Sequence, residues 1–324
     1  MPDQETLPKP RVSVIVPTFN SLPYIEETHA SIMSALDYYG EAEAIFCDNG
    51  SEDGTTAFFT SRPDPRTQVL HVPDAHIGAV RNAGARIATG DYLLFLDSDC
   101  TIPKSYLDSL VATFRATDAD AVGSRVVLPS RAPWVPRTWH QMHFPHKSSN
   151  VDWLNSANFA VRRDVFQQIE GFSDSLETGE DAEIGARMTR NGYRLYQDLS
   201  LVVIHHRNPG TLSQFWRKEI WRGLGMFGTV RQNLFDKPVL MTFLHGVFLV
   251  FGLAVLAASS QSIPVRVAET LGLALTVPVA AVIYRAAQNR RLVSPLRSVA
   301  LYFLYFTARL VSLSRIIRGK IVSI

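Results

Sequence analysis

Cysteine is scarce in this chain of 324 residues, which contains only Cys47 and Cys100. The two residues stand far apart and form neither a CxxC pair nor a Cys/His cluster, so they suit a reducing compartment and give no sign of a disulfide framework. An excess of charge of one sign is also lacking, since 32 Lys and Arg residues and 30 Asp and Glu residues leave a net charge of +2. Without a basic field we expect no nucleic-acid partner.

The N-terminus lacks the apolar run that a signal peptide requires. Residues 1–10 form a polar tail that contains proline, and we expect the globular part that follows to remain in the cytosol. A glycine-rich phosphate loop bearing a lysine is missing as well, which disfavours a nucleotidyltransferase.

Strands and helices alternate in the first two-thirds of the chain. The β-branched run at 12–16, closed by Pro17, predicts a buried strand, and the apolar run at 92–96 predicts another. Between them we expect a helix at 24–39, a strand at 42–47, a helix at 55–60, a strand at 67–72 and a helix at 77–88. This order predicts an α/β fold with a mostly parallel sheet flanked by helices. Ligands of such sheets lie beyond the carboxyl ends of the strands.

The last third is mostly apolar. Residues 239–258 carry no formal charge and have the length needed to cross the hydrocarbon core of a bilayer. Residues 267–284 form a second candidate span, and residues 299–317 form a third that Arg309 interrupts. A central arginine is costly in lipid, so we expect the third segment at the interface or against its neighbours. A buried helical bundle in a soluble protein is the alternative.

Arginines crowd the loop between the second and third apolar segments, at positions 285, 290, 291 and 297. The positive-inside rule places this loop in the cytosol, which two crossings satisfy and a third would not, because it would export Arg315, Arg318 and Lys320. We therefore expect a protein of the plasma (inner) membrane whose preceding domain faces the cytoplasm. The predicted division is a tail at 1–10, an α/β domain at 11–210, an interfacial helix or linker with aromatic and basic residues at 211–238, and a membrane region at 239–324.

Two aspartates follow the predicted strand at 92–96. Asp97 and Asp99, separated by Ser98, can hold a hard divalent cation through oxygen ligands. Such a cation would neutralise the diphosphate of a nucleotide sugar and act as a Lewis acid on the leaving group. Taken alone the triplet is weak evidence, because an exposed turn can have the same composition.

Several motifs accompany this triplet. In order they are residues 12–20 (VSVIVPTFN), 48–55 (DNGSEDGT), 78–92 (GAVRNAGARIATGDY), 93–99 (LLFLDSD), 158–166 (NFAVRRDVF), 171–172 (GF) and 179–187 (GEDAEIGAR). This succession, within about residues 10–225, closely resembles the family 2 glycosyltransferases. The resemblance implies an inverting enzyme with the GT-A fold, followed here by an all-α hydrophobic membrane region.

The resemblance also implies where the donor nucleotide binds. The matching residues are Pro17, Thr18, Asn20, Asp48, Asp53, Arg81, Asn82 and Asp97. Among them Asp48 matches a carboxylate that accepts a hydrogen bond from the base, typically uracil, so a UDP-sugar is the expected donor. Arg81 and Asn82 match a pair near the ribose and diphosphate. Arg81 could instead be an ordinary surface residue of a helix, and Asp48 and Asp53 could simply form turns.

A metal site and a catalytic base follow from the same resemblance. Asp97 and Asp99 match the pair that binds Mg²⁺ or Mn²⁺, and His205 or His206 matches a histidine that completes the metal shell. Ordinary histidines at a strand end are the alternative for the last two. Asp181 matches the general base that deprotonates the acceptor, with Glu180 beside it as support.

The position of the acidic pair has a second explanation. Asp181 begins a predicted helix at 181–190, where the helix dipole stabilises a carboxylate. Glu180 and Asp181 could therefore merely cap this helix. An inverting transfer, on the other hand, needs one base on the acceptor side, together with charge neutralisation at the leaving group.

A second group of histidines has a spacing of three, at positions 140, 143 and 146. Trp134, Pro136 and Pro145 argue against a regular helix there, so we expect a loop on the acceptor side and no zinc site.

The expected function is sugar transfer from a nucleotide-diphosphate-sugar to a saccharide or a polyprenyl-linked lipid, in polysaccharide or glycolipid biosynthesis at the membrane. A processive polysaccharide synthase and a non-catalytic membrane scaffold with the same fold are the alternatives. The intact aspartates weigh against the scaffold.

Overall fold

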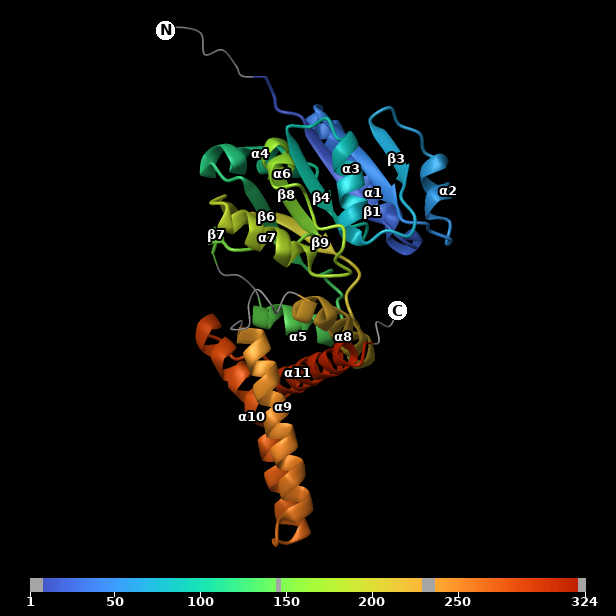
Figure 1. The fold of residues 1–324 in the computed structure, drawn as a ribbon. Coiled ribbons are helices and arrows are strands. Elements are labelled where there is room, and N and C mark those ends of the chain that lie inside the picture. The colour runs from blue at the N-terminus through green and yellow to red at the C-terminus, as the bar shows by residue number, and fades with distance from the viewer. Residues whose placement is uncertain (1–7, 144–146, 229–236, 320–324) are drawn as a thin grey trace. The chain divides into compact units, whose positions relative to one another are not determined.

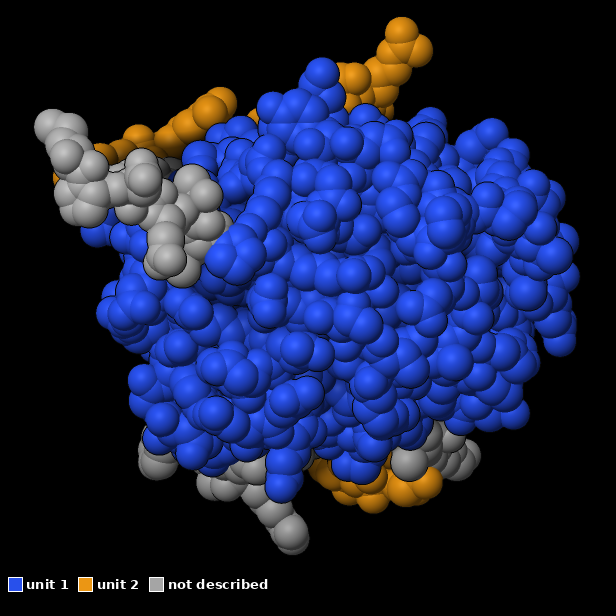
Figure 2. All heavy atoms as spheres, turned by 90° about the horizontal axis from the view of Figure 1, so that it is seen from above, with its two compact units in different colours: residues 1–129, 147–207 blue, residues 130–146, 208–324 orange. Residues whose placement is uncertain are grey.

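The computed structural model describes residues 8–143, 147–228 and 237–319, with the side chains of 226–228 left aside. The chain divides into two compact units (Figure 2). Unit 1 comprises residues 1–129 and 147–207, and unit 2 comprises residues 130–146 and 208–324.

Unit 1 is an α/β layer structure with a mixed sheet. Its strands are β1 (Val12–Thr18), β2 (Ala42–Asp48), β3 (Thr67–His71), β4 (Tyr92–Leu96), β5 (Cys100–Thr101), β6 (Ala121–Val127), β7 (Ser149–Val151), β8 (Asn158–Arg162) and β9 (Leu195–His205). Its helices are α1 (Leu22–Tyr39), α2 (Thr55–Thr60), α3 (Ile77–Ile87), α4 (Tyr106–Thr117), α6 (Arg163–Gln168) and α7 (Glu180–Arg190). The predicted strands and helices of residues 12–96 are all present, with ends that differ by no more than a few residues.

The strand order is β3-β2-β1-β4-β8-β6-β9-β5, with β7 paired to β9. The first four strands are parallel, whereas β8 pairs antiparallel with both β4 and β6. Parallel strands place their carboxyl ends at one edge, so the turns after β1, β2 and β4 meet there. The predicted α/β fold with a mostly parallel sheet is confirmed.

Strands β1, β2 and β4 are buried along their whole length, and the helices of unit 1 cover the sheet from both sides (Figure 1). Along β1, Val14 and Val16 join the core formed with α1 and α4, whereas Ile15 joins the core formed with α3, α6 and α7. This alternation is the period of two of a β-strand. Burial on both faces explains why these strands read as continuous apolar runs.

Helix α3 packs directly against the sheet at Gly84. A Cβ atom at this position would lie 2.6 Å from Cγ2 of Ile15 and 2.7 Å from Sγ of Cys47. Only a glycine permits this approach. The close packing fixes α3, which carries Arg81 one turn earlier, against β1 and β2.

Unit 2 is helical. It consists of α5 (Trp134–His143), α8 (Leu212–Gly228), α9 (Lys237–Ala258), α10 (Ile263–Asn289) and α11 (Pro295–Ile317). Its core joins Val135 and Met142 of α5 to Phe215 of α8 and to apolar residues of α10 and α11. Within this unit α9 and α10 form a long hairpin, and α11 lies beside α8 (Figure 1). Three described helices, α9, α10 and α11, are long and apolar enough to cross a membrane.

Residues 130–146 differ from the sequence-based expectation. They were expected within the α/β domain and, around the histidines, as a loop, but residues 134–143 form helix α5 of unit 2. Pro136 is compatible with this helix because it stands in the first turn, where its missing N–H is not needed. The apolar side of α5 draws the segment into the helical core. His146 lies outside the described residues.

Candidate active site

The Asp97-Ser98-Asp99 turn follows β4 at the carboxyl edge of the sheet and is fixed on both sides. The amide of Asp97 donates to the carbonyl of Ala157 at 3.2 Å. The Ser98 hydroxyl lies 2.7 Å from the hydroxyl of Ser21, in the loop after β1, and the Ser98 carbonyl accepts from Thr28 of α1 at 3.0 Å. These contacts tie the turn to both neighbouring elements, so its carboxylates have a defined position.

Asp99 and His205 approach one another at the end of the turn. Nε2 of His205 lies 3.6 Å from Oδ1 of Asp99, and the two side chains are 15% and 13% exposed. One ligand atom each from Asp99, Cys100 and His205 lie within 4.8 Å of one another, an arrangement that could hold a metal ion. Burial raises the pKa of the Cys100 thiol well above its usual value, so Cys100 is a poor ligand beside the other two.

His206 points to a different environment. Its Nε2 lies 3.0 Å from the hydroxyl of Thr101, and its Nδ1 lies 3.8 Å from the carboxylate of Glu27. Its backbone amide donates to the carbonyl of Asp99 at 2.8 Å. Of the two predicted histidines, His205 is therefore the one whose ring faces the Asp99 carboxylate.

Arg81 connects the Asp97-Ser98-Asp99 turn to the acidic pair Glu180 and Asp181 at the start of α7. Its Nη1 donates to Glu180 at 2.7 Å, and its Nη2 donates to Asp97 at 2.8 Å. Only 3% of the Arg81 side chain is exposed, so it is not a surface residue of the helix. Glu180 is also buried, at 6% exposure, and accepts a further hydrogen bond from Ser156 at 3.1 Å.

Asp181 stands next to Glu180 in the first turn of α7. Burial, followed by the neighbouring charge of Glu180, raises the pKa of Asp181 to about 6. The amide of Ala182 donates to its Oδ1 at 2.8 Å. A carboxyl with a pKa near 6 is ionised at neutral pH and has more proton affinity than an ordinary aspartate, as a general base requires.

Asp48 ends β2 and is completely buried, with 0% exposure. Its two oxygens accept four hydrogen bonds, from the amide and hydroxyl of Ser51 and from the hydroxyls of Thr18 and Thr56. Burial alone would raise the pKa of Asp48, but these hydrogen bonds outweigh it and lower the pKa. Because a carboxylate has about four acceptor sites, Asp48 here shapes the loop, and its predicted contact with a base would require one donor to leave.

The other residues predicted to bind the donor in the loops after β1 and β2 form hydrogen bonds that hold these two loops together. Pro17 is buried in β1, and Asn20, at a positive φ of 47°, accepts from the amide of Glu52 at 3.0 Å. Asp53 accepts from the amide of Leu22 at 2.9 Å and from that of Thr55 at 3.0 Å, so one carboxylate caps the starts of α1 and α2.

Asn82 follows Arg81 but forms its hydrogen bonds with a different segment, the loop before α7. Its Nδ2 donates to the carbonyl of Phe172 at 2.8 Å and to Asp174 at 2.7 Å, and its Oδ1 accepts from the amide of Phe172 at 3.0 Å. Both the nitrogen and the oxygen of the Asn82 side-chain amide are therefore engaged in hydrogen bonds. Asn82 thus holds the loop before α7, and the geometry gives no independent support for its predicted place near the ribose.

Sequence reasoning missed Ser21 and Ser156. Their hydroxyls contact Ser98 and Glu180, respectively, and so position the residues that carry the charges. Serine is common in loops, and neither position stands out from its neighbours in the sequence. Only the contacts across the fold reveal them.

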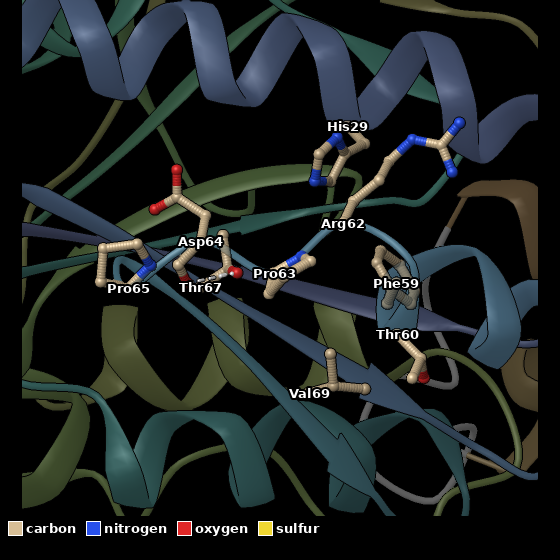
Figure 3. Close-up of a pocket in the computed structure, with 9 residues that line it drawn as sticks. All are labelled: His29, Phe59, Thr60, Arg62, Pro63, Asp64, Pro65, Thr67 and Val69. Atoms are coloured by element: carbon tan, nitrogen blue, oxygen red, sulfur yellow. Dashed lines mark hydrogen bonds between the residues drawn. The ribbon is translucent and has the colours of Figure 1, made fainter.

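A cavity of about 400 Å³ lies elsewhere in unit 1 (Figure 3). It is lined by residues of α1, α2, β3 and the connecting loop, among them His29, Phe59, Arg62 and Val69. It contains none of the predicted site residues. The loop at 61–66 precedes β3, so the cavity lies toward the amino end of this strand, away from the edge that carries the aspartates.

Comparisons with known proteins identify a matching family, similar sequences and a similar fold. The Glycosyl transferase family 2 model matches residues 13–175. The glycosyltransferase AglE of Haloferax volcanii is 28% identical over 207 residues, which are 62% of this chain and 68% of that protein. The glucosyl-dolichyl phosphate glucuronosyltransferase of the same organism is 25% identical over 211 residues, covering 61% of this chain and 67% of the relative.

A solved structure has the same fold. The mannosyltransferase PcManGT from Pyrobaculum calidifontis, in complex with GDP-Man and Mn²⁺, has a TM-score of 0.61 and 19% identity, and covers 96% of this chain and 88% of its own. At this identity the likeness establishes the fold, which is GT-A. Since the family model also matches half of the sequence, the chain belongs to glycosyl transferase family 2.

Proposed function

We propose that this protein is a membrane-associated inverting glycosyltransferase that uses a nucleotide-diphosphate-sugar, with a UDP-sugar as the expected donor. The observation that carries the proposal is a group of charged side chains on the Asp97-Ser98-Asp99 turn and on the elements beside it. Asp99 and His205 form a candidate metal pair, and Arg81 joins the neighbouring Asp97 to Glu180, beside Asp181. Leaving-group and acceptor-side chemistry are thus available in one site.

The residues at the turn fit a divalent cation. Asp99 offers carboxylate oxygens and His205 an imidazole nitrogen, while one oxygen of Asp97 is held by Arg81. An imidazole in the set favours Mn²⁺ over Mg²⁺, which binds mainly through oxygens. When bound, the ion would neutralise charge on the departing nucleoside diphosphate.

Asp181 is the base in this proposal. It removes the proton of the acceptor hydroxyl while that oxygen attacks the anomeric carbon, and the bond from this carbon to the diphosphate oxygen breaks in the same displacement. The single displacement inverts the anomeric centre. Glu180 is held by Arg81 and Ser156, so it supports the site by position, and its charge helps to raise the pKa of Asp181.

The acceptor is proposed to be a saccharide or a lipid-linked sugar in polysaccharide or glycolipid biosynthesis. Three apolar helices of unit 2 support a membrane location, where such lipids reside. The name of one relative also includes a glucosyl-dolichyl phosphate, which is consistent with a polyprenyl-linked acceptor. We place unit 1 at the cytoplasmic face of the plasma membrane, following the arginines of the loop between α10 and α11.

Replacement of the two histidines should separate their roles. We expect His205→Ala to weaken Mn²⁺ binding by at least about tenfold, because it removes a direct ligand of the metal. Loss of a residue that only hydrogen-bonds to a ligand already lowers metal affinity by about tenfold or more. His206→Ala, whose ring contacts Thr101, should bind Mn²⁺ as the wild type does. Titration of Mn²⁺ into the purified full-length protein with a nucleoside diphosphate present measures both. Equal losses, or a loss only in His206→Ala, would contradict the assignment.

The function itself is tested by sugar transfer. Full-length protein in detergent is incubated with Mn²⁺, a panel of labelled UDP- and GDP-sugars, and a bacterial lipid extract. We expect one donor to label the extract by addition of a single sugar. Long products would favour a processive synthase, and absence of both transfer and donor hydrolysis with the whole panel would favour a scaffold.

A further inference from the structure

Helix α11 differs from α9 and α10 in having an ion pair at its middle. Nη2 of Arg309 lies 2.9 Å from Oε2 of Glu219 in α8, and the two side chains are 9% and 1% exposed. Arg222 of α8 donates to the other oxygen of Glu219 at 3.0 Å. The Arg309 guanidinium also lies 4.9 Å from the centre of the Tyr305 ring. The arginine that interrupts the third apolar segment is therefore neutralised by α8.

The contact between α8 and α11 continues along both helices. One turn beyond the ion pair, the hydroxyl of Ser312 donates to the carbonyl of Ile220 at 2.7 Å. A Cβ on Gly223 would come within 2.6 Å of Cβ of Ser312, so only glycine fits there. From Glu219 to Gly223 of α8, the contacts move from Arg309 to Ser312 of α11. The two helices therefore pack side by side over about one turn.

Helix α8 is unsuited to the hydrocarbon core of a membrane. Arg217 and Arg222 are exposed on it, and among the described helices it is not one of those long and apolar enough to span. Its mixture of tryptophan and arginine is typical of the headgroup layer. If α11 crossed the bilayer, Arg309 would carry Glu219 and the charges of α8 into lipid, where each is costly.

We infer that α11 is a membrane-surface helix and that the chain crosses the bilayer twice, through α9 and α10. The α8–α11 pair then lies in the phospholipid headgroup layer, with the basic ends of α11, Arg297 and Arg315, in contact with lipid phosphates. The turn at 259–262 lies on the far side of the membrane. This inference rests on the contacts within unit 2 and does not depend on the proposed function.

Cysteine labelling in intact and permeabilised cells tests the topology with the full-length protein. The exposed positions Gln261, Leu292 and Arg318 are changed one at a time to cysteine and treated with a membrane-impermeant maleimide. The native cysteines are buried, and the unmodified protein measures their background. We expect Leu292→Cys and Arg318→Cys to be labelled from the same side and Gln261→Cys from the other. Labelling of Gln261→Cys and Arg318→Cys from one side would overturn the inference.

A depth measurement removes dependence on any single position. Spin labels at Ala300, Val311 and Ile317, attached through cysteine in vesicles of phosphatidylethanolamine and phosphatidylglycerol, report their exposure to dissolved oxygen and to a water-soluble nickel complex. If α11 lies on the membrane surface, the labels near its two ends should have similar depths in the bilayer. The depth should vary only with the face of the helix that carries each label. A depth that is greatest at the middle and falls to water on opposite sides would show a crossing and refute the proposal.

Discussion

Asp181→Asn should lower the rate of sugar transfer by about 10²–10⁴-fold, the usual contribution of a positioned general base. Asparagine has nearly the same shape and can still accept the hydrogen bond from the Ala182 amide, so the start of α7 should remain intact. Donor binding should therefore survive. The measurement is the initial rate with the accepted donor, alongside calorimetric titration of the nucleoside diphosphate.

The pH dependence of the wild-type rate provides a second readout of the same residue. Because the pKa of Asp181 is raised to about 6, the base is protonated and inactive below this pH, and the rate should fall on the acid side with a midpoint near 6. The residual activity of Asp181→Asn should lack this limb. Asp164→Asn, an exposed acid in the first turn of α6, is the matched control and should behave as wild type. Full turnover by Asp181→Asn would refute the assignment of the base.

Arg81→Met should destabilise unit 1 and reduce activity together. It removes the cation that two carboxylates share, and breaking a buried pair from one side costs about 3–5 kcal/mol. Asp97 is 30% exposed, so the lower part of this range is expected. For a unit of this size the melting temperature should drop by roughly 10 °C. Thermal unfolding of the full-length protein in detergent measures the change.

A double substitution distinguishes lost charge pairing from lost volume. Adding Glu180→Gln to Arg81→Met removes one of the stranded charges, so part of the stability should return, whereas the rate should not. Arg86→Met, at the exposed end of the same helix, is the control for loss of an arginine from α3. Melting of Arg81→Met within a degree of the wild type would contradict the bridging role, as would a double variant less stable than the single one.

Much of the fold was predictable because its signals are local. Strands β1 and β4 are buried on both faces, which produces short, continuous apolar runs. The helices between them have periodic patterns and clear ends. Helix α5 was missed because Pro136 reads as a helix breaker, and its position in the first turn is evident only from the structure. Its place in unit 2 depends on packing with α10 and α11, which lie far along the chain.

The site shows the same limit more sharply. The sequence provided candidates for the residues that carry the chemistry, yet Arg81 and Glu180 are 99 positions apart, and no local pattern indicates that they pair. It could not choose between His205 and His206 either, since adjacent residues at the end of a strand point to opposite sides. Donor binding by Asp48, Asp53 and Asn82 stays a prediction. The structure adds that these side chains form hydrogen bonds with the loops around them, which the sequence did not indicate.

Titration of a UDP-sugar or GDP-sugar into the full-length protein, with Mn²⁺ and then with a chelator, measures whether donor binding at the end of β4 depends on a metal ion. We expect saturable binding of a donor with Mn²⁺, loss of most of this affinity with the chelator, and the same loss in Asp99→Asn with Mn²⁺ present. Binding that is equally tight with the chelator, or in Asp99→Asn, would contradict a metal-dependent donor site at the end of β4.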